Sequence, residues 1–580
     1  MATAAPVRPW STLTSQLTPE RRRVVGLAAI LLAGTLLPLA GPQLISRFVD
    51  DAIAQAPTSH LAGIALVYLA VAVGTQSCAV AVSYLGSGLS WRTTNRLREQ
   101  LVAHALDLDM AFHGRHTAGE MIERVDGDVV KLTEFISGFV MQAISSGLLL
   151  AGTLVLVFAA NLLVGAVLTA MVLTGGVVLA RAQQRVLPQA TALREETAQL
   201  FGNLEERLAG AEDIRANGAG RHVVNRFHEA SARVYRADVA WQVSGGLVLA
   251  GTNLLFGIGT IVVVALGIVL LDRGAVTVGT VVLLFQYAQM VRRPVEQIVF
   301  QAKDLQQAGA SVNRVAELLA EQPSVVFAQP GRPLPPTGPL GVRLAGVTFA
   351  YPGVERRVLD DVDLAIPAGR SVGVVGRTGS GKSTLARLLL RLYDPTGGRV
   401  ELGGVDLREV SQPDLRRRVG MVTQEVQLFG ATVRENVTLF DDEIADETVA
   451  AVLDEVGLTH WVAELPDGLS TQLGAAGTGL SEGEAQLLAL ARVFLADPGL
   501  VVLDEPSSRL DPATDALITR ATDRLLAGRT GFVIAHRMSS LARVDDIVVV
   551  EHGRIVEHGP RAELAADPTS RYAGMLGATR

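Results

Sequence analysis

A glycine-rich segment in the second half of the sequence carries the residue types most able to do chemistry. It reads Gly376-Arg377-Thr378-Gly379-Ser380-Gly381-Lys382-Ser383-Thr384, between a strand-like apolar run, Ser371–Val375, and a helical pattern at residues 385–393. Glycines let backbone N–H groups close around phosphates, and a helix that begins at the loop adds the positive end of its dipole. Lys382 can reach the β- and γ-phosphates, and Ser383 can ligate Mg²⁺. The segment therefore predicts a phosphate-binding loop for ATP and Mg²⁺, with a simple glycine-rich turn as the alternative.

A pair of carboxylates follows a second apolar strand. Residues 500–503 are all apolar and lead directly into Asp504 and Glu505. Asp504 is predicted to hold the magnesium through water, and Glu505 to polarise the attacking water as a base. An acidic strand end without function is the alternative for such a pair alone, and a preceding phosphate-binding loop makes that alternative less favoured.

Composition places part of the chain in lipid. The 580 residues are 49% hydrophobic and 19% charged, with a mean hydropathy of +0.33, which is too apolar for a soluble protein of this length. Uncharged runs of membrane-spanning length occur before about residue 305 and not after it. This asymmetry predicts two domains.

Six apolar runs of about 20 or more residues predict membrane-spanning helices. They lie at residues 24–45, 61–89, 139–160, 162–180, 243–271 and 276–299. The uncharged run 139–180 is long enough for two crossings and predicts a helical hairpin that turns near Asn161. Six spans return the chain to the side on which it starts.

Arginine positions predict the orientation of these spans. Arginines cluster before the first span, between the second and third, and between the fourth and fifth, so the positive-inside rule places those segments and the N-terminus in the cytoplasm. The two long basic loops carry helical periodicity, so we expect helical arms that extend beyond the bilayer. The basic cluster at residues 21–23 precedes a long apolar run without a cleavage site, which predicts a first span rather than a signal peptide.

A proline-rich segment at residues 321–340 separates the two domains, and its composition favours a semi-rigid, extended linker. Residues 1–320 are therefore predicted to form an all-α six-helix transmembrane domain with long cytoplasmic arms. In residues 341–580, short Val, Ile and Leu runs alternate with helical patterns. This alternation predicts an α/β P-loop nucleotide-binding domain with a largely parallel sheet.

Cysteine content and charge exclude other classes of protein. The single cysteine, Cys78, lies in an apolar run, which excludes an intrachain disulfide framework and indicates a buried packing residue. The net charge of -7, without a basic stripe, argues against a nucleic-acid partner.

Several further motifs accompany the loop and the carboxylate pair in a fixed order. They are Tyr351 in Phe-Ala-Tyr-Pro, Gln424 in Val-Thr-Gln-Glu, the segment 480–484, Asp511 in Ser-Arg-Leu-Asp, and His536 after an apolar strand. In this order they resemble the ATP-binding cassette (ABC) family, and the membrane half resembles the six-span, exporter-type half-transporters of that family. Residues 117–128 and 206–216 look like the cytoplasmic-arm sequences that in the family flank short coupling helices seated on the nucleotide-binding domains, with solvated amphipathic helices as the alternative. The resemblance covers nearly the whole chain.

The resemblance implies a role for each matched residue. Tyr351 would stack on adenine, Gln424 would sense magnesium and the γ-phosphate, and His536 would contact the γ-phosphate. The catalytic residues would be Glu505 and His536. The metal would be held by Ser383, Gln424 and Asp504, and the nucleotide site would also include Ser481, Gly483 and Asp511.

The sequence departs from the family in its signature motif. The family's Leu-Ser-Gly-Gly-Gln binds the γ-phosphate of ATP held on the opposite subunit, whereas this chain has Leu480-Ser481-Glu482-Gly483-Glu484. Unit charges about 4 Å apart interact by about 4 kcal/mol at an effective dielectric of about 20, so a carboxylate near a triphosphate opposes closure unless it points away.

This departure, beside an intact Lys382 and an intact carboxylate pair, favours a heterodimer. In the family, each ATP site combines the phosphate-binding loop of one subunit with the signature of the other. A homodimer would have two impaired signatures. We therefore expect a partner half-transporter with an intact Leu-Ser-Gly-Gly-Gln and a replaced catalytic carboxylate.

The resemblance implies an ATPase coupled to transmembrane movement, a multi-pass protein of the cytoplasmic membrane that exports a small amphipathic molecule, drug, lipid or peptide. An importer of the same architecture, for example of a metal-chelator complex, and an ATP-regulated channel are the alternatives. Arg292, Arg293 and Glu296 near the inner end of the sixth span could line a cavity for an amphipathic or anionic cargo, although snorkelling toward the cytoplasm is the favoured interpretation.

Overall fold

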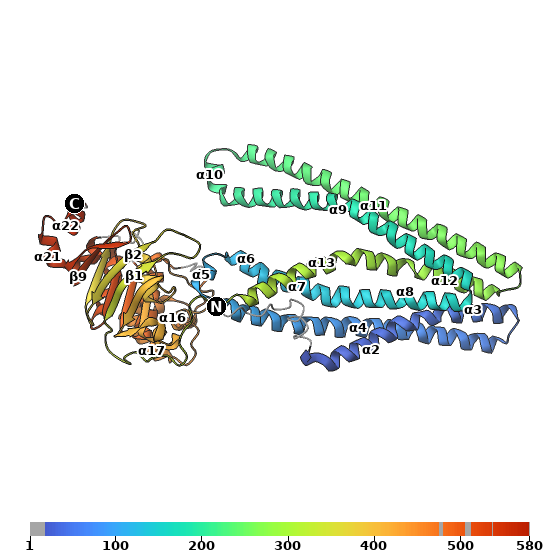
Figure 1. Cartoon of the computed structure of the whole chain (residues 1–580), viewed down its shortest axis with the longest axis horizontal. Coiled ribbons are helices and arrows are strands. Elements are labelled where there is room, and N and C mark those ends of the chain that lie inside the picture. Colours follow the sequence, from blue (N-terminus) through green and yellow to red (C-terminus); the bar gives the residue numbers. More distant parts are fainter. Residues whose placement is uncertain (1–17, 475–479, 505–511, 536–537, 579–580) are drawn as a thin grey trace. The chain divides into compact units, whose positions relative to one another are not determined.

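The computed structural model describes residues 18–474, 480–504, 512–535 and 538–578. These residues form two compact units, of which the first comprises Met1–Ala105 and Ala118–Glu321 and the second comprises Leu106–Thr117 and Gln322–Arg580 (Figure 1). A short segment from the first half of the chain therefore belongs to the second unit. The sequence pattern placed that segment in the membrane domain.

The first unit is built from helices. Their bounds are α2 (Arg21–Leu36), α3 (Ala40–Ile53), α4 (Thr58–Asp107), α6 (Ala118–Ile122), α7 (Asp128–Glu134), α8 (Met141–Ala160), α9 (Leu162–Ala209), α10 (Ala211–Ala216), α11 (Gly220–Asp272), α12 (Val278–Met290) and α13 (Arg292–Ala320). The 3₁₀ turns η1 (Thr18–Glu20) and η2 (Leu37–Leu39) and the π-helical turns η3 (Glu123–Gly127) and η4 (Phe135–Val140) join several of them. The predicted all-α membrane domain is confirmed.

Five helical stretches of the described residues are long and apolar enough to cross a membrane. They are Thr18–Ile53, Thr58–Asp107, Ala118–Ala160, Leu162–Ala209 and Gly220–Asp272, and they contain the first five predicted spans. Three helices, α4, α9 and α11, have 50, 48 and 53 residues. At 1.5 Å per residue each is roughly 70–80 Å long, more than twice the thickness of a bilayer's hydrocarbon core.

The sixth predicted span, 276–299, is divided between α12 and the start of α13, with the break at Val291. Pro294 has no backbone N–H, so it cannot bond to the carbonyl of Met290 as a continuous helix would require. The sequence pattern predicted one span over residues 276–299, and the structure divides this segment between two helices.

The predicted hairpin at Asn161 is confirmed. α8 ends at Ala160 and α9 begins at Leu162. The Asn161 side chain accepts hydrogen bonds from the N–H groups of Leu163 and Val164 at 3.0 and 3.2 Å, and so caps the second helix. Farther along, α9 and α11 lie side by side and α10 joins them at one end of the pair (Figure 1).

A buried carboxylate joins α7 to α13. The side chain of Asp128 is fully buried and forms an ion pair with Arg314. Arg314 Nε donates to Asp128 Oδ2 at 2.8 Å, and the Ser311 hydroxyl donates to Oδ1 at 2.8 Å. Both oxygens therefore have partners, which offsets the large cost of removing a carboxylate from water.

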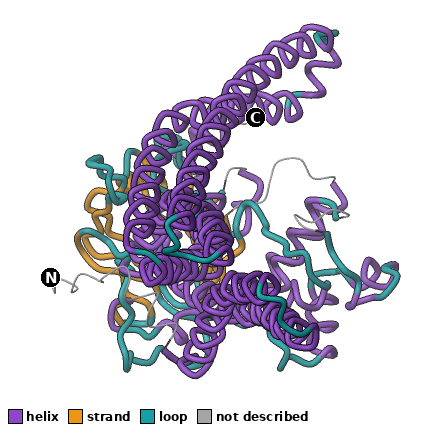
Figure 2. Tube along the Cα trace, turned by 90° about the vertical axis from the view of Figure 1, so that its right-hand side faces the viewer, coloured by secondary structure: helices purple, strands orange, loops and turns teal. Residues whose placement is uncertain are grey.

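The second unit contains all the described strands (Figure 2). They are β1 (Val342–Phe349), β2 (Leu359–Ile366), β3 (Ser371–Val375), β4 (Gly397–Leu402), β5 (Val405–Asp406), β6 (Val419–Val422), β7 (Leu500–Asp504), β8 (Thr530–Ile534), β9 (Asp546–Glu551) and β10 (Arg554–Pro560). Its helices are α5 (Met110–His113), α14 (Lys382–Leu389), α15 (Gln412–Arg418), α16 (Val433–Thr438), α17 (Asp446–Glu455), α18 (Thr459–Glu464), α19 (Glu482–Ala496), α20 (Pro512–Leu526), α21 (Arg561–Ala566) and α22 (Arg571–Ala578). The predicted α/β fold is confirmed.

Two sheets organise this unit, a four-stranded sheet in the order β2-β1-β4-β5 and a six-stranded sheet in the order β10-β9-β3-β8-β7-β6. All pairs of the larger sheet are parallel except that of β10 with β9. Every residue of β7 and β8 is buried, and alternate residues enter two separate apolar clusters. Continuous apolar runs are typical of parallel strands covered on both faces.

Candidate functional site

Four parallel strands end in one row at the same edge of the larger sheet. Val374 of β3 and Asp504 of β7 both pair with Ile534 of β8. Leu503 of β7 pairs with Val422 of β6. Ligands of open α/β sheets bind at the carboxyl ends of the strands. The loops that start from this row carry the glycine-rich segment, the carboxylate pair and the glutamine motif.

Positive φ angles in the glycine-rich loop require glycine. Gly376, Gly379 and Gly381 have φ values of +152°, +79° and +110°. A Cβ on Gly381 would also lie 2.7 Å from a methyl carbon of Leu359. Backbone conformation and close packing against β2 therefore both exclude a larger residue at Gly381.

Backbone N–H groups of this loop remain available to a ligand. Those of Gly379, Gly381, Lys382 and Ser383 donate to no atom of the described residues. The hydroxyl oxygen of Ser380 is buried and likewise has no hydrogen-bond partner there. A buried polar group without a partner costs about 1–3 kcal/mol, and N–H groups at a helix N-terminus bind anions. The loop therefore fits a polyphosphate.

Lys382 is almost fully buried, with 5% of its surface exposed. Its Nζ donates to the carbonyls of Gly376 and Arg377 at 2.8 and 3.1 Å, and so holds the loop closed around the side chain. Burial lowers the pKa of the Lys382 ammonium below its ordinary value, and the nearby Asp504 carboxylate opposes that shift. The ammonium is placed between the loop and the carboxylate at the end of β7.

Tyr351 lies against the first turns of α14. Its hydroxyl is 3.0 Å from the Thr384 hydroxyl and accepts a hydrogen bond from Arg387 at 2.9 Å. Its ring packs edge-on against Phe349 and Tyr393, with centroids 4.9 and 5.3 Å away. The structure thus brings the tyrosine that follows β1 to the helix that begins at the phosphate-binding loop.

The oxygen atoms predicted to hold magnesium come from three elements. Ser383 is exposed in the first turn of α14, Asp504 is 9% exposed at the end of β7, and Gln424 is exposed in the loop after β6. Hydroxyl, carboxylate and amide oxygens are hard ligands that suit Mg²⁺. The predicted residues Glu505, Asp511 and His536 lie outside the described residues.

Glu484 of the signature motif bonds to the cap of its own helix. Ser481 is the N-cap of α19, and its hydroxyl accepts from the Glu484 N–H at 3.3 Å. In return, Glu484 Oε2 accepts from the N–H and the hydroxyl of Ser481 at 2.7 and 2.8 Å. This capping box directs the Glu484 carboxylate onto Ser481, whereas Glu482 is exposed and Gly483 is buried.

Nothing in the sequence pattern predicts the link between α19 and the loop after β6. Arg492 of α19 donates to the carbonyls of Asn436 and Gln427 at 2.7 and 3.0 Å. The fully buried Asn436 amide bonds in turn to both backbone groups of Phe429. The helix that starts at the signature is thereby tied to the segment that follows Gln424.

Asp109 joins the segment 106–117 to the interdomain linker within the second unit. Its Oδ1 caps α5 by accepting from the N–H groups of Ala111 and Phe112. Its Oδ2 accepts from the Ser324 hydroxyl at 2.5 Å, from the Ser324 N–H, and from the Val325 N–H at 3.0 Å. Desolvation would raise the pKa of Asp109, but the hydrogen bonds from Ser324 and Val325 outweigh it and hold that pKa below its ordinary value.

The same segment packs on the nucleotide-binding fold. Ala111 belongs to the apolar cluster beneath the four-stranded sheet, and the Tyr393 hydroxyl donates to the Met110 carbonyl at 3.1 Å. On the linker, the Phe327 ring packs against the guanidinium of Arg391. The central guanidinium carbon lies 4.5 Å from the centroid of the Phe327 ring. α5 and the linker therefore contact one surface, which also presents the aromatic ring that packs on Tyr351.

The chain fuses a helical unit that has membrane-spanning stretches to an α/β unit that has a phosphate-binding loop. This combination defines a membrane protein that binds a nucleotide. Residues 25–295 match the family model described as the ABC transporter transmembrane region, and residues 359–508 match the model described as ABC transporter. The chain belongs to the ABC transporter family. It binds ATP, and it is a multi-pass membrane protein whose ATPase activity is coupled to transport.

Curated relatives cover most of the chain. A fatty acid ABC transporter ATP-binding/permease protein of Mycobacterium bovis is 33% identical over 82% of this chain and 75% of its own length. An ATP-dependent lipid A-core flippase of Chromohalobacter salexigens is 30% identical over 85% of this chain and 84% of its own length. The structure of a bacterial Atm1-family ABC exporter with ATP bound has a TM-score of 0.81 at 24% identity, covering 96% of this chain and 98% of that one. This likeness establishes the fold.

Replacing Asp109 with alanine is expected to release the linker from α5. The change removes a charged acceptor of several hydrogen bonds, so local protection of the linker amides should fall by about 2 kcal/mol, or roughly thirtyfold in exchange rate. Hydrogen exchange of peptides covering residues 320–330 measures this. Because the folded-state pKa of Asp109 is lowered, the carboxylate stabilises the contact at neutral pH, and that contribution is lost as pH falls through the folded-state pKa.

The matched control is Asp107→Ala, which removes an exposed carboxylate two residues away. This variant should leave exchange in the linker unchanged. Equal exchange rates for the two variants would show that Asp109 does not anchor the linker.

Comparing Glu484→Ala with Glu484→Gln should show whether the hydrogen-bonded cap or the negative charge of Glu484 stabilises the first turn of α19. Glutamine can fill the same position of a capping box, whereas alanine cannot, so the alanine variant should lose about 1 kcal/mol of protection in the first turn of α19 and the glutamine variant much less. Hydrogen exchange of a peptide covering residues 480–488 measures the difference. Equal loss in both variants would mean that the charge of Glu484, rather than its cap, stabilises the turn.

Proposed function

We propose that this chain is one half of a heterodimeric exporter with two unequal ATP sites, which moves a small amphipathic molecule out across the cytoplasmic membrane. One observation carries the proposal. Two carboxylates, Glu482 and Glu484, lie in the first turn of α19, in a chain that retains Lys382, Asp504 and Glu505. The chain thus combines a complete hydrolytic half-site with a poor signature.

Each residue of the half-site has a task in this proposal. When bound, ATP with Mg²⁺ supplies a phosphoanhydride bond whose cleavage can drive a conformational cycle. The loop amides and Lys382 would hold the phosphates, and Ser383, Asp504 and Gln424 would hold the metal. Tyr351 would stack on the base. Glu505 would orient and polarise water, and His536 and Asp511 would complete the site.

The signature residues lead to unequal sites. Glutamine at position 484 could form the same capping box with Ser481, so this chain's signature departs from the family's in its negative charge. The carboxylates of Glu482 and Glu484, both in the first turn of α19, also compensate the positive end of the helix dipole that would attract an anion. A partner with an intact signature would therefore complete the site around Glu505, and this chain's signature would complete a site that mainly retains ATP.

The names of two relatives support a lipid-like, amphipathic cargo, and the name of a third, a putative multidrug export ATP-binding/permease protein of Bacillus subtilis, supports outward movement. One relative is a fatty acid transporter and another is a lipid A-core flippase. We place the N-terminus and the nucleotide-binding unit in the cytoplasm, since the basic loops of the sequence favour that side. Export then follows when ATP-driven closure of the two nucleotide-binding units opens the membrane helices outward.

Hydrolysis of ATP in lipid tests the pairing. We expect the purified chain alone to be nearly inactive, the chain with a candidate partner half-transporter that has an intact Leu-Ser-Gly-Gly-Gln to be active, and Glu505→Gln in that pair to abolish turnover. Glu447→Gln, an exposed glutamate in α17, is the matched control and should retain full activity. Full turnover by the lone chain as a homodimer would disprove the unequal-site proposal.

Restoring the family's signature should strengthen ATP binding at the site that this signature completes. The double change Glu482→Gly and Glu484→Gln removes two negative charges from the first turn of α19, so that site should bind ATP about fivefold more tightly after allowance for solvent and salt screening. Equilibrium binding of a labelled ATP analogue to the pair carrying Glu505→Gln measures this. Unchanged affinity would show that the two carboxylates do not weaken the site.

A further inference from the structure

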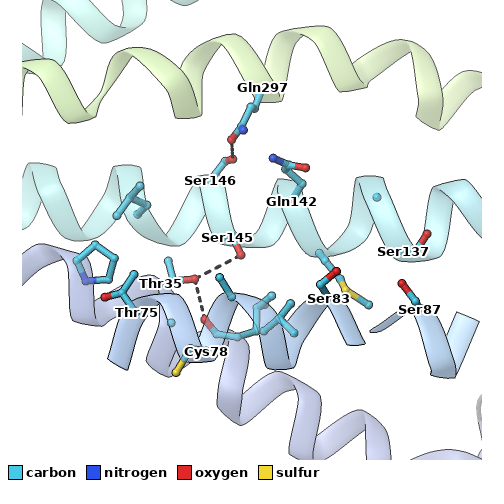
Figure 3. A pocket seen from close by; sticks show the side chains of 18 residues that line it. Thr35, Thr75, Cys78, Ser83, Ser87, Ser137, Gln142, Ser145, Ser146 and Gln297 are labelled. Atoms are coloured by element: carbon cyan, nitrogen blue, oxygen red, sulfur yellow. Dashed lines mark hydrogen bonds between the residues drawn. The ribbon is translucent and has the colours of Figure 1, made fainter. Parts of the chain in front are cut away.

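A cavity of about 500 Å³ lies among the helices of the first unit. Its wall is formed by α2, η2, α4, η4 and α8, with Gln297 of α13 on the opposite side (Figure 3). Pro38 lines it at the point where the first helix changes from α2 to the 3₁₀ turn. Nearly all of the lining residues fall within predicted spans, so the cavity lies at membrane depth. Its volume is in the range of small-molecule sites.

The wall of the cavity is polar but carries no fixed charge. Among the described residues that line it, none is Asp, Glu, Lys, Arg or His. Hydroxyl and amide side chains supply the polarity, and they are Thr35, Thr75, Ser83, Ser87, Ser137, Gln142, Ser145, Ser146 and Gln297. Such a wall offers hydrogen bonds but no counter-ion.

Some of these polar groups have partners and others do not. The Thr35 hydroxyl donates to the Leu31 carbonyl at 2.7 Å, and the Ser146 hydroxyl donates to Gln297 Oε1 at 2.7 Å (Figure 3). Ser83, Ser87 and Gln142 make no side-chain hydrogen bond to a described residue. All three side chains are exposed, so their polar groups are open to a ligand or to water.

The charged residues near the end of the sixth span do not line this cavity. Arg292 bonds to the side-chain oxygen of Asn253, and its Nε lies 3.8 Å from Glu296. Arg293 is likewise absent from the described lining. The possibility raised by the sequence, that these residues receive an anionic cargo, therefore finds no support at this cavity.

We propose that this cavity binds the transported molecule, and that the molecule is an uncharged amphiphile with hydroxyl or carbonyl groups beside an apolar body. The inference rests on the proposed export function and adds the chemical class of the cargo. Ser83, Ser87 and Gln142 bind the polar groups of the ligand, and the apolar lining, including Leu31, Val82 and Leu149, contacts its body. A free ion entering the cavity would lose its hydration without gaining a counter-ion, so fatty-acid anions and cationic drugs are disfavoured.

A thiol placed in the wall reports occupancy without requiring ATP turnover. Cys78 is the single cysteine of the sequence, so Cys78→Ala gives a background without cysteine, and Ser83→Cys then adds one nearly isosteric thiol. The full-length chain is reconstituted in lipid vesicles with its partner, and the rate of N-ethylmaleimide labelling is measured. Ser87→Cys is a second reporter should the first variant fail to fold. Ser244→Cys on α11, outside the described lining, is the matched control.

Three probes with the same dodecyl tail differ only in the head group: glycerol monododecanoate is uncharged, dodecanoate is anionic and dodecyltrimethylammonium is cationic. We expect the glycerol ester to slow labelling of the wall thiol by at least about fivefold and the two ions by less than about twofold, because only the uncharged head group can exchange water for these hydroxyl and amide partners. Labelling of the Ser244→Cys control should not change with any probe.

Equal protection by an ionic probe, or protection by none, would overturn the assignment of an uncharged cargo. ATPase activity of the same vesicles distinguishes this result from failure of the proposed function. An active pair without protection contradicts the cavity assignment alone. Selective protection in a pair without ATPase activity supports the cavity and contradicts the exporter proposal.

Discussion

Backbone hydrogen bonding between parallel strands is the constraint on which the nucleotide site depends. The register that pairs Val374 and Asp504 with Ile534 brings the ends of β3, β8 and β7 to one row, and β6 continues it through Val422. Glycines at positive φ, the buried Lys382 and the N-terminus of α14 can act together only because β3 ends in that row. A slip of one residue would reverse the faces of the strands and separate these groups.

Hydrogen bonds from a few polar side chains connect the nucleotide-binding fold to α5, to the linker and to the helix that begins at the signature. Asp109 caps α5 and accepts hydrogen bonds from the linker, so one carboxylate ties two distant parts of the sequence to the nucleotide-binding unit. Arg492 and Asn436 tie the helix that begins at the signature to the segment after Gln424. These hydrogen bonds involve a charged group or are buried, so each costs free energy to break. A movement of one element is therefore expected to move the element bonded to it.

The membrane unit follows a different constraint, because lipid supplies no hydrogen bonds to the backbone. Long helices satisfy their backbone hydrogen bonds internally. The side chains of these helices then determine which ligands the interior of the membrane unit can bind. Hydroxyls such as that of Thr35 bond back to their own helix, so they add polarity without charge. A cavity lined in this way offers hydrogen bonds without charge, which is why the proposed cargo is uncharged.

The sequence by itself determined the two-domain order, the first five membrane helices, the hairpin at Asn161 and the strand-loop-helix around Lys382, since each depends on local apolar runs, capping and glycine spacing. Tertiary structure decided the rest. The packing of residues 106–117 in the second unit, and the bonds from Arg492 to Asn436 and Gln427, depend on contacts between residues far apart in the sequence. A pattern of residue types cannot contain these contacts, because hydrogen bonds between distant residues arise only once the elements have packed. The break at Val291 and the return of Glu484 onto Ser481 are different, since each has a local signal, in Pro294 and in the spacing of Ser481 and Glu484, that hydropathy alone does not contain.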